Sequence, residues 1–270
     1  MKRFLTYISM FLILAVITAC NTLPETALVP AGREEPKTDL WLLAIGINEY
    51  SNNYFPNLFF AASDAQNINS AFKAQEGKAF KKVNTLLITD IDAIKPTKTN
   101  IFSNLEFLQD AQPEDTIIIF LASHRIMENN IYYLMPSDSV YREDTGLDFS
   151  SMIKFEDFIQ ELNMPGNKII ILDTQFPEGA SKMAAEKGII ILGACGESQQ
   201  AIEHRLLGGG LLSLSVVEAL NTNTGVSGSI RLKDIFAFVA ARVKELSENK
   251  QDPVLHVPAD AENMVLGVRN

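Results

Sequence analysis

Residues 168–172, Lys-Ile-Ile-Ile-Leu, form an apolar run that constrains the fold more than any other stretch of the 270-residue chain. The run is rich in β-branched side chains, and Pro and Gly follow it, so it predicts a buried central strand that ends in a loop. We expect Asp173 to close this strand. Loops at the carboxyl ends of parallel strands carry the chemistry of open α/β sheets, so we expect Gln175 at the functional edge.

Similar apolar runs recur along the chain and alternate with helical patterns. The predicted strands are residues 40–47, 83–88, 116–121, 168–172 and 188–192, with 264–268 as an edge or final strand. Helices are predicted from Ser63 or Asp64, from Thr97 or Thr99, and at residues 155–162, 180–186, 211–220 and 232–246. Between them, residues 131–135 belong to a small hairpin, and a polar loop continues to about Asp148. The alternation predicts an α/β fold with a mostly parallel sheet of about six strands and helices on both faces.

The N-terminus has the features of an export signal. Lys2 and Arg3 precede an almost wholly apolar stretch at residues 4–17, so residues 1–19 are predicted to be a signal peptide. Cys20, directly after Thr-Ala, resembles the cysteine of the bacterial lipobox, which takes a diacylglyceryl group and becomes the mature N-terminus. The alternatives are an ordinary signal and a short N-terminal anchor, and both would also export the protein.

The resulting domain organisation is simple. Residues 20–38 contain three prolines and a glycine, which is typical of a tether, and residues 39–270 form the folded domain. A lipid on Cys20 would hold this domain at a bacterial membrane, on the periplasmic face or the cell surface. Cys195 is then the only free thiol, so no intramolecular disulfide is expected.

The charge of the chain excludes nucleic acid as an expected partner. Loss of residues 1–19 leaves 21 basic and 33 acidic residues, a formal charge of −12. Such a surface repels nucleic acid and anionic head groups. The expected attachment to the membrane is therefore through lipid and not through charge.

Two polar segments follow neighbouring predicted strands, and they carry a family resemblance. His124 follows the strand at 116–121, and Asp173-Thr174-Gln175 follows the strand at 168–172. Here the chain resembles the caspase-like, metacaspase-type cysteine peptidases, in which one strand ends in Gly-His-Gly and the next sheet strand ends in Asp-x-Cys-x-x-Gly. The stretches that carry the resemblance are residues 43–50, 62–65, 115–124, 132–138, 168–179, 193–201, 210–213 and 251–254. The resemblance implies a caspase-like three-layer sandwich for the whole domain.

The departures from the family pattern concern the catalytic residues. The nucleophile position falls on Gln175, and an amide cannot form a thiolate or attack a carbonyl. Ser123 and Arg125 replace the two glycines around His124, the second of which helps to shape the oxyanion hole in the family. The resemblance therefore implies a pseudopeptidase that acts as a binding or scaffolding module. His124 is expected to be vestigial and bonded to loop backbone.

Two acidic residues of the family pattern are retained. The positions of Asp64 and Asp173 match acids that bind the basic residue before the cleaved bond in metacaspase-like members. The resemblance therefore implies that these residues bind a Lys or Arg side chain of a peptide or protein segment. The alternative is structural, with Asp64 capping its helix and Asp173 accepting hydrogen bonds from loop amides.

Two other functions remain open from the sequence. One is an active cysteine endopeptidase that cleaves after basic residues, with Cys195 as a displaced nucleophile and His124 as its base. The other is an α/β binding lipoprotein unrelated to these peptidases. The three histidines lack metal-ligand spacing, so we expect no metal and no cofactor. Residues 208–210, Gly-Gly-Gly, are interpreted as a flexible loop, and the acidic residues between 138 and 148 as a solvated loop and not a calcium site.

Overall fold

The computed structural model describes residues 36–176, 178–221, 228–258 and 261–268, without the side chains of residues 178–181. The chain divides into residues 1–34 and 35–270, and everything described below lies in the second unit. The predicted signal peptide, Cys20 and most of the tether lie outside the described residues.

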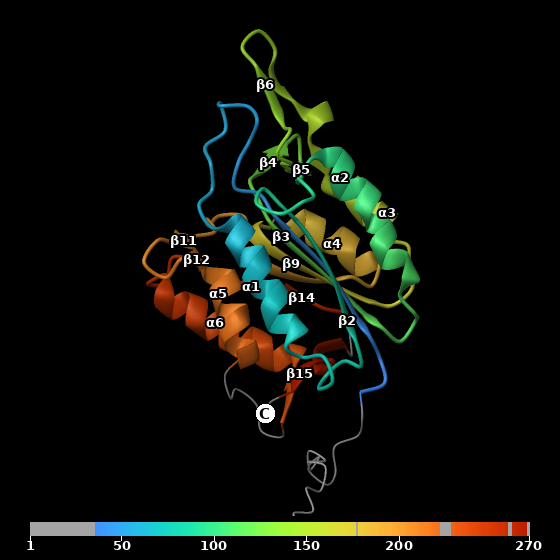
Figure 1. The fold of residues 1–270 in the computed structure, drawn as a ribbon. Helices are drawn as coiled ribbons and strands as arrows, with labels where there is room; N and C mark the ends of the chain where they lie inside the picture. The colour runs from blue at the N-terminus through green and yellow to red at the C-terminus, as the bar shows by residue number, and fades with distance from the viewer. Residues whose placement is uncertain (1–35, 177, 222–227, 259–260, 269–270) are drawn as a thin grey trace, which may run out of the picture. The chain divides into compact units, whose positions relative to one another are not determined.

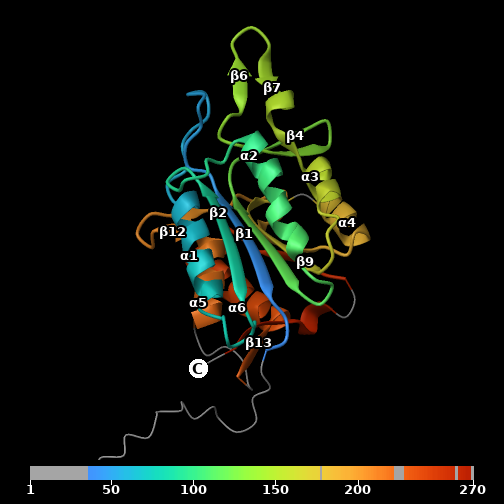
Figure 2. The same ribbon diagram turned by 45° about the vertical axis from the view of Figure 1, so that its right-hand side comes forward.

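A six-stranded sheet forms the centre of this unit, with the strand order β14-β10-β9-β3-β1-β2 (Figures 1 and 2). Its strands are β1 (Leu40–Gly46), β2 (Val83–Thr89), β3 (Thr116–Ala122), β9 (Asn167–Gln175), β10 (Ile190–Cys195) and β14 (Val254–His256). The first five are parallel, and only β14 runs antiparallel to its neighbour β10. The predicted sheet of about six mostly parallel strands is confirmed.

The sixth strand differs from the predicted one. Residues 264–268 were expected at the edge of this sheet, but β15 (Val265–Val268) instead pairs with β13 (Ser229–Arg231) in a separate two-stranded sheet. The edge is taken by β14, a three-residue strand between Pro253 and Pro258. Such a short segment between prolines carries no periodicity that would identify it as a strand.

Helices cover both faces of the sheet, as predicted. One face carries α1 (Ala61–Lys73), α5 (Leu211–Asn221) and α6 (Leu232–Leu246). The other carries α2 (Lys98–Ser103) with its 3-10 continuation η1 (Asn104–Asp110), α3 (Phe155–Glu161) and α4 (Glu178–Glu186).

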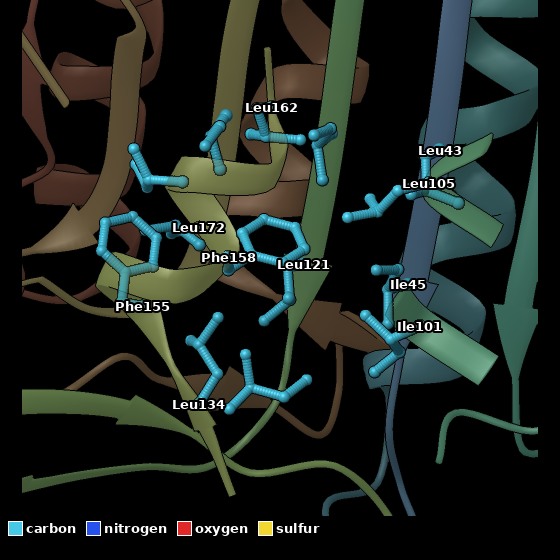
Figure 3. Packing of buried hydrophobic residues seen from close by; sticks show 14 of the residues in the cluster. Leu43, Ile45, Ile101, Leu105, Leu121, Leu134, Phe155, Phe158, Leu162 and Leu172 are labelled. Atoms are coloured by element: carbon cyan, nitrogen blue, oxygen red, sulfur yellow. The ribbon is translucent and has the colours of Figure 1, made fainter. Parts of the chain in front are cut away.

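Successive strand residues serve opposite layers of the core. Within β1, Leu42 and Ala44 pack with α1 and α5, whereas Leu43 and Ile45 pack with α2 and α3. Figure 3 shows Leu43 and Ile45 on the second side, in a cluster that includes Phe158 of α3. This explains why the strands read as unbroken apolar runs, because a parallel sheet covered on both faces has no polar side.

The starts of the helices were predicted with mixed success. Thr97 caps α2, where its hydroxyl accepts a hydrogen bond from the Asn100 N–H at 3.2 Å. The prediction of Ser63 or Asp64 as the cap of α1 is wrong, because α1 begins at Ala61 and has no side-chain cap. Asp64 therefore lies inside the first turn, which leaves its carboxylate for contacts outside the helix.

Smaller elements lie between β3 and β9. β4 (Arg125–Glu128), β5 (Ile131–Leu134) and β8 (Ile153–Lys154) form a three-stranded sheet that contains the predicted hairpin. The predicted polar loop is instead the hairpin of β6 (Val140–Arg142) and β7 (Gly146–Asp148), followed by η2 (Phe149–Ser151). Asp148 stabilises this hairpin through an ion pair with Arg142 at 3.0 Å. The remaining elements are β11 (Glu203–His204), β12 (Gly209–Gly210) and η3 (Ala261–Asn263).

Gln251, which is fully buried, holds three of these segments together. Its Nε2 donates to the Ala194 carbonyl of β10 at 3.0 Å, and its Oε1 accepts from the Ile202 N–H before β11 at 2.9 Å. Its own N–H donates to the Ser247 hydroxyl at the end of α6 at 3.1 Å. The loop that leads to β11 is thereby fixed against the carboxyl end of β10.

Replacement of Gln251 by Ala should destabilise the domain markedly. The change leaves the buried Ala194 carbonyl and the partly buried Ile202 N–H without these partners, which should lower the free energy of unfolding by roughly 2 to 5 kcal/mol. Urea unfolding followed by circular dichroism measures this loss. Gln160→Ala, an exposed change on α3, is the matched control and should be nearly neutral; equal stability of the two variants would contradict the assignment.

Candidate functional site

The site lies at the carboxyl edge of the sheet, where β3 and β9 end side by side. The two strands pair in parallel with Leu121 opposite Leu172. This register brings residues 123–125 beside residues 173–175 and confirms the predicted adjacency of the two strands. A cavity of about 300 Å³ opens here, lined by Leu58, Ala61, Asp64, residues 122–125, residues 173–175, residues 200–203 and Gly210.

The end of β9 differs from the prediction that Asp173 closes the strand. β9 continues to Gln175, and an irregularity in its pairing with β10 places Leu172 opposite Gly193 but Gln175 opposite Cys195. Three steps along β9 therefore match two along β10, which is the pattern of a β-bulge. Bulges redirect side chains at sheet edges, and here the carboxylate of Asp173 reaches the start of α5.

The structure brings the two predicted acids together. Asp64 is only 2% exposed, and its Oδ2 accepts the Gly210 N–H at 2.8 Å. Asp173 Oδ2 accepts the Ser213 N–H at 3.2 Å and also the Ser213 hydroxyl. The Oδ1 atom of each carboxylate accepts no hydrogen bond from a residue that the structure describes, and that of Asp64 is buried.

Glycine is required where β12 crosses the two acids. A Cβ at Gly209 would lie 2.6 Å from Asp64 Oδ1, and one at Gly210 would lie 2.3 Å from Asp173 Oδ2. Both distances are far below van der Waals contact. The interpretation of residues 208–210 as a flexible loop is therefore wrong for Gly209 and Gly210, which are buried and pair with β11.

Burial and mutual repulsion perturb this acid pair. Burial, and next the charge of Asp173, raise the pKa of Asp64 well above its usual range, against the opposing hydrogen bond from Gly210. Burial also raises the pKa of Asp173, and the hydrogen bonds from Ser213 oppose this effect. Glu203 adds a third negative charge that raises both pKa values. The pair therefore favours holding a proton until a cation compensates it.

Glu203 was missed in the sequence and has a clear role in the structure. Its carboxylate accepts the N–H groups of Phe59 at 3.0 Å and Phe60 at 2.8 Å, just before α1. It thereby ties β11 to the start of α1. Like Ser213, it belongs to no local pattern that predicts a contact, because each reaches a partner far away in the sequence.

His124 is bonded to loop backbone. Its Nε2 lies 2.7 Å from the Pro56 carbonyl oxygen, and since a carbonyl can only accept, Nε2 carries the proton. The His124 N–H donates to the Tyr50 hydroxyl at 2.8 Å, and the two rings stack with centroids 5.1 Å apart. Nδ1 is therefore unprotonated and can accept a hydrogen bond, while the hydrogen bond from Nε2 fixes the orientation of the ring.

Gln175 is hydrogen-bonded by two residues of the small β4-β5-β8 sheet, which lies between β3 and β9 in the chain. Arg125 Nη2 donates to Gln175 Oε1, and the Tyr132 hydroxyl donates to the Gln175 carbonyl oxygen at 2.9 Å. Cys195, opposite Gln175, is fully buried, and burial raises the pKa of its thiol to about 12. Such a thiol carries almost no thiolate at neutral pH.

In the described part of the chain, no group of three or more His, Cys, Asp or Glu side chains is arranged to hold a metal ion. A membrane-spanning helix is likewise not found among the described residues.

Comparisons with known proteins agree with the fold and the order of these segments. A family model for the caspase domain matches residues 40–262. The structure is similar to protein GSU0716 from Geobacter sulfurreducens, with a TM-score of 0.61 and 10% identity, covering 87% of this chain and 100% of that one. It is also similar to the Drosophila initiator caspase Dronc, with a TM-score of 0.55 and 11% identity, covering 86% and 85%. No curated protein matches the chain in sequence. At these identities the structural matches concern the fold alone.

Replacement of Asp64 by Asn should change how stability depends on pH. Above about pH 4 the unfolded chain has released its Asp proton while folded Asp64 retains it, so the wild type loses stability as pH rises. Asn does not titrate, so the free energy of unfolding of the variant should increase relative to that of the wild type by up to about 1.4 kcal/mol per pH unit. Urea unfolding at about pH 5 and about pH 7.5 measures this difference.

The control is Asp157→Asn, which removes an exposed carboxylate on α3. Its stability should follow that of the wild type at both pH values. Parallel pH profiles for Asp64→Asn and the wild type would contradict the raised pKa of Asp64.

Proposed function

The chain belongs to the caspase domain family, and from this premise we propose that its domain is a pseudopeptidase, which binds a basic side chain of a peptide or protein without cleaving it. The observation that carries this proposal is the pair of carboxylates of buried Asp64 and half-buried Asp173, in a cavity that Gln175 also lines. Family membership excludes the alternative of an α/β lipoprotein unrelated to these peptidases.

The absence of cleavage follows from the chemistry at the end of β9. By the resemblance described above, the nucleophile position falls on Gln175, whose amide has no nucleophilic form. The Gln175 side chain also accepts a hydrogen bond from Arg125, which fills space beside it. An enzyme without its nucleophile retains only the modest acceleration that its binding contacts supply.

Cys195 is a poor substitute nucleophile. Its thiol is fully buried, and burial is the first cause of its raised pKa, with the charge of Asp173 as the second. A thiol reacts as the thiolate, which this environment disfavours. These features weigh against the alternative of an active endopeptidase that uses Cys195.

The acids favour a cationic ligand. Asp64 and Asp173 each have one oxygen that accepts no hydrogen bond from a described residue, and both line the cavity. A Lys or Arg side chain that enters would form charge-assisted hydrogen bonds and compensate the repulsion between the two carboxylates. The ligand would displace the proton that the raised pKa of Asp64 favours, so the affinity of the ligand should increase with pH.

Binding of a basic peptide should depend on Asp173. A short fluorescein-labelled peptide that contains one Arg should bind the wild type, and Asp173→Asn should weaken the binding about tenfold, since the lost charge pair is worth about 1.4 kcal/mol. Fluorescence anisotropy measures both affinities, and the wild-type affinity should fall as salt is added. Asp157→Asn is the control with an unchanged cavity.

Equal binding by the wild type and Asp173→Asn would contradict this function. The same peptide should remain intact on incubation, and Cys195→Ala should make no difference to it. Hydrolysis after the basic residue that disappears in Cys195→Ala would instead favour the active peptidase.

We also propose that the protein is a bacterial lipoprotein, exported and held at a membrane by a lipid on Cys20. The support is the basic, apolar and small-residue pattern of residues 1–20. The pattern predicts a modified cysteine at the mature N-terminus, followed by the tether to the domain.

Metabolic labelling with a fatty acid tests the lipid anchor. The wild type should incorporate label, and Cys20→Ala should abolish it because no other thiol takes the lipid. Cys195→Ala, the matched control, should be labelled like the wild type. Label that persists in Cys20→Ala would exclude the lipobox.

A further inference from the structure

The cavity at the carboxyl edge is lined by charged groups of both signs. Asp64, Asp173 and Glu203 supply negative charge, and Arg125 lines the same cavity as a cation. Arg125 is partly buried at the start of β4, directly after His124. The site is therefore bipolar and not simply acidic.

Arg125 has hydrogen-bonding capacity to spare. Its Nη2 donates a hydrogen bond to Gln175 Oε1, and it forms no ion pair with a carboxylate of the described residues. A guanidinium has five N–H donors in a planar fork that matches a carboxylate with two parallel bonds. A partly buried cation without an anionic partner is costly, so a ligand carboxylate would be strongly favoured here.

Asp173 lies close along β9 to Gln175, the hydrogen-bond partner of Arg125. The two residues are two positions apart, so even in a fully extended strand their backbones are at most about 7 Å apart, and a β-bulge interrupts the strand here. An extended Lys or Arg side chain covers such a span between its α-carboxylate and its cationic end. The cavity of about 300 Å³ lies at the small end of ligand sites, which suits one residue rather than a chain that runs through.

From this geometry we propose that the cavity binds the C-terminal residue of a peptide that ends in Lys or Arg. The basic side chain lies against Asp64 and Asp173, and the free α-carboxylate binds Arg125 beside Gln175. This inference rests on the proposed function for the side chain and adds the carboxylate. The domain would thus recognise the product of cleavage after a basic residue, and not the intact chain.

A peptide fits better than a free amino acid because the rim of the cavity can contact more than one residue. Leu58 lines the cavity, and the adjacent Phe59 is 57% exposed with the Arg205 guanidinium 4.7 Å from its ring centroid. Arg205 covers one face of this ring, and the part that stays exposed, next to the cavity-lining Leu58, offers an apolar surface to the residues that precede the C-terminus.

Fluorescence anisotropy with the full-length protein in detergent tests the proposal. Four labelled probes are compared: a short peptide that ends in Arg as the free acid, its C-terminal amide, the same peptide extended by alanines, and a free acid that ends in norleucine. The free acid with Arg should bind at least about tenfold more tightly than the amide or the extended peptide, because only it carries a carboxylate on the basic residue itself. In the Arg125→Gln variant, the ratio of the affinity for the free acid to the affinity for the amide should fall close to one. Arg142→Gln, on the exposed β6–β7 hairpin, should keep the wild-type ratio.

The outcomes separate this inference from the proposed function. Equal binding of the free acid and the amide by the wild type would overturn the carboxylate site while leaving basic side-chain recognition intact. Equal binding of the Arg and norleucine acids would overturn the proposed function instead. Free arginine that competes as strongly as the peptide acid would overturn the assignment of a peptide ligand. The comparison of the free acid with the amide uses the wild-type protein alone. The proposal can therefore be refuted even if the Arg125→Gln variant folds poorly.

Discussion

The parallel pairing of β3 with β9 is the contact on which the site depends. Parallel neighbours end at the same edge of a sheet, so one register brings together two segments that are about fifty residues apart in the chain. The start of α1 and β12, which contact each other through Asp64 and Gly210, complete the cavity beside these two strand ends. A slip of one residue would send each strand's side chains to the opposite layer, and the two different core clusters forbid it.

Burial of two neighbouring carboxylates works against stability, and the structure limits this cost in a specific way. Backbone N–H groups of Gly210 and Ser213 satisfy one oxygen of each acid, and the start of α5 places a favourable dipole at Asp173. β12 approaches the two acids so closely that a side chain at Gly209 or Gly210 would clash with them. Glycine at these two positions therefore accompanies the hydrogen bonds to the acids. On the function proposed above, a cationic ligand in the cavity would offset this cost by pairing with the two acids.

The sequence predicted the parts of this structure that depend on local apolar patterns. The unbroken apolar runs of β1, β3 and β9 were recognisable because both faces of a parallel sheet are buried. β14 was missed because three residues between prolines show no pattern, and the cap of α1 was misassigned because Ser63 and Asp64 resemble a cap without serving as one. In the site, the resemblance identified Asp64, His124, Asp173 and Gln175, which the structure brings to one cavity. The Pro56 carbonyl and the close packing of Gly210 could not be predicted, because they follow from tertiary contacts and not from residue type.

The contact between Arg125 and Gln175 makes the two departures from the family pattern depend on each other. If Gln175 alone were replaced by Cys, the guanidinium would lie against the new sulfur, where it would favour a thiolate but also occupy the space of a substrate carbonyl. If Arg125 alone were replaced by Gly, the Gln175 amide would lose its partner and leave a neutral, unreactive cavity wall. Neither single change restores a nucleophile with an open oxyanion site. On the proposed function, the pair forms one altered binding surface, in which a cation and an amide occupy the position that the resemblance assigns to the nucleophile and its oxyanion site.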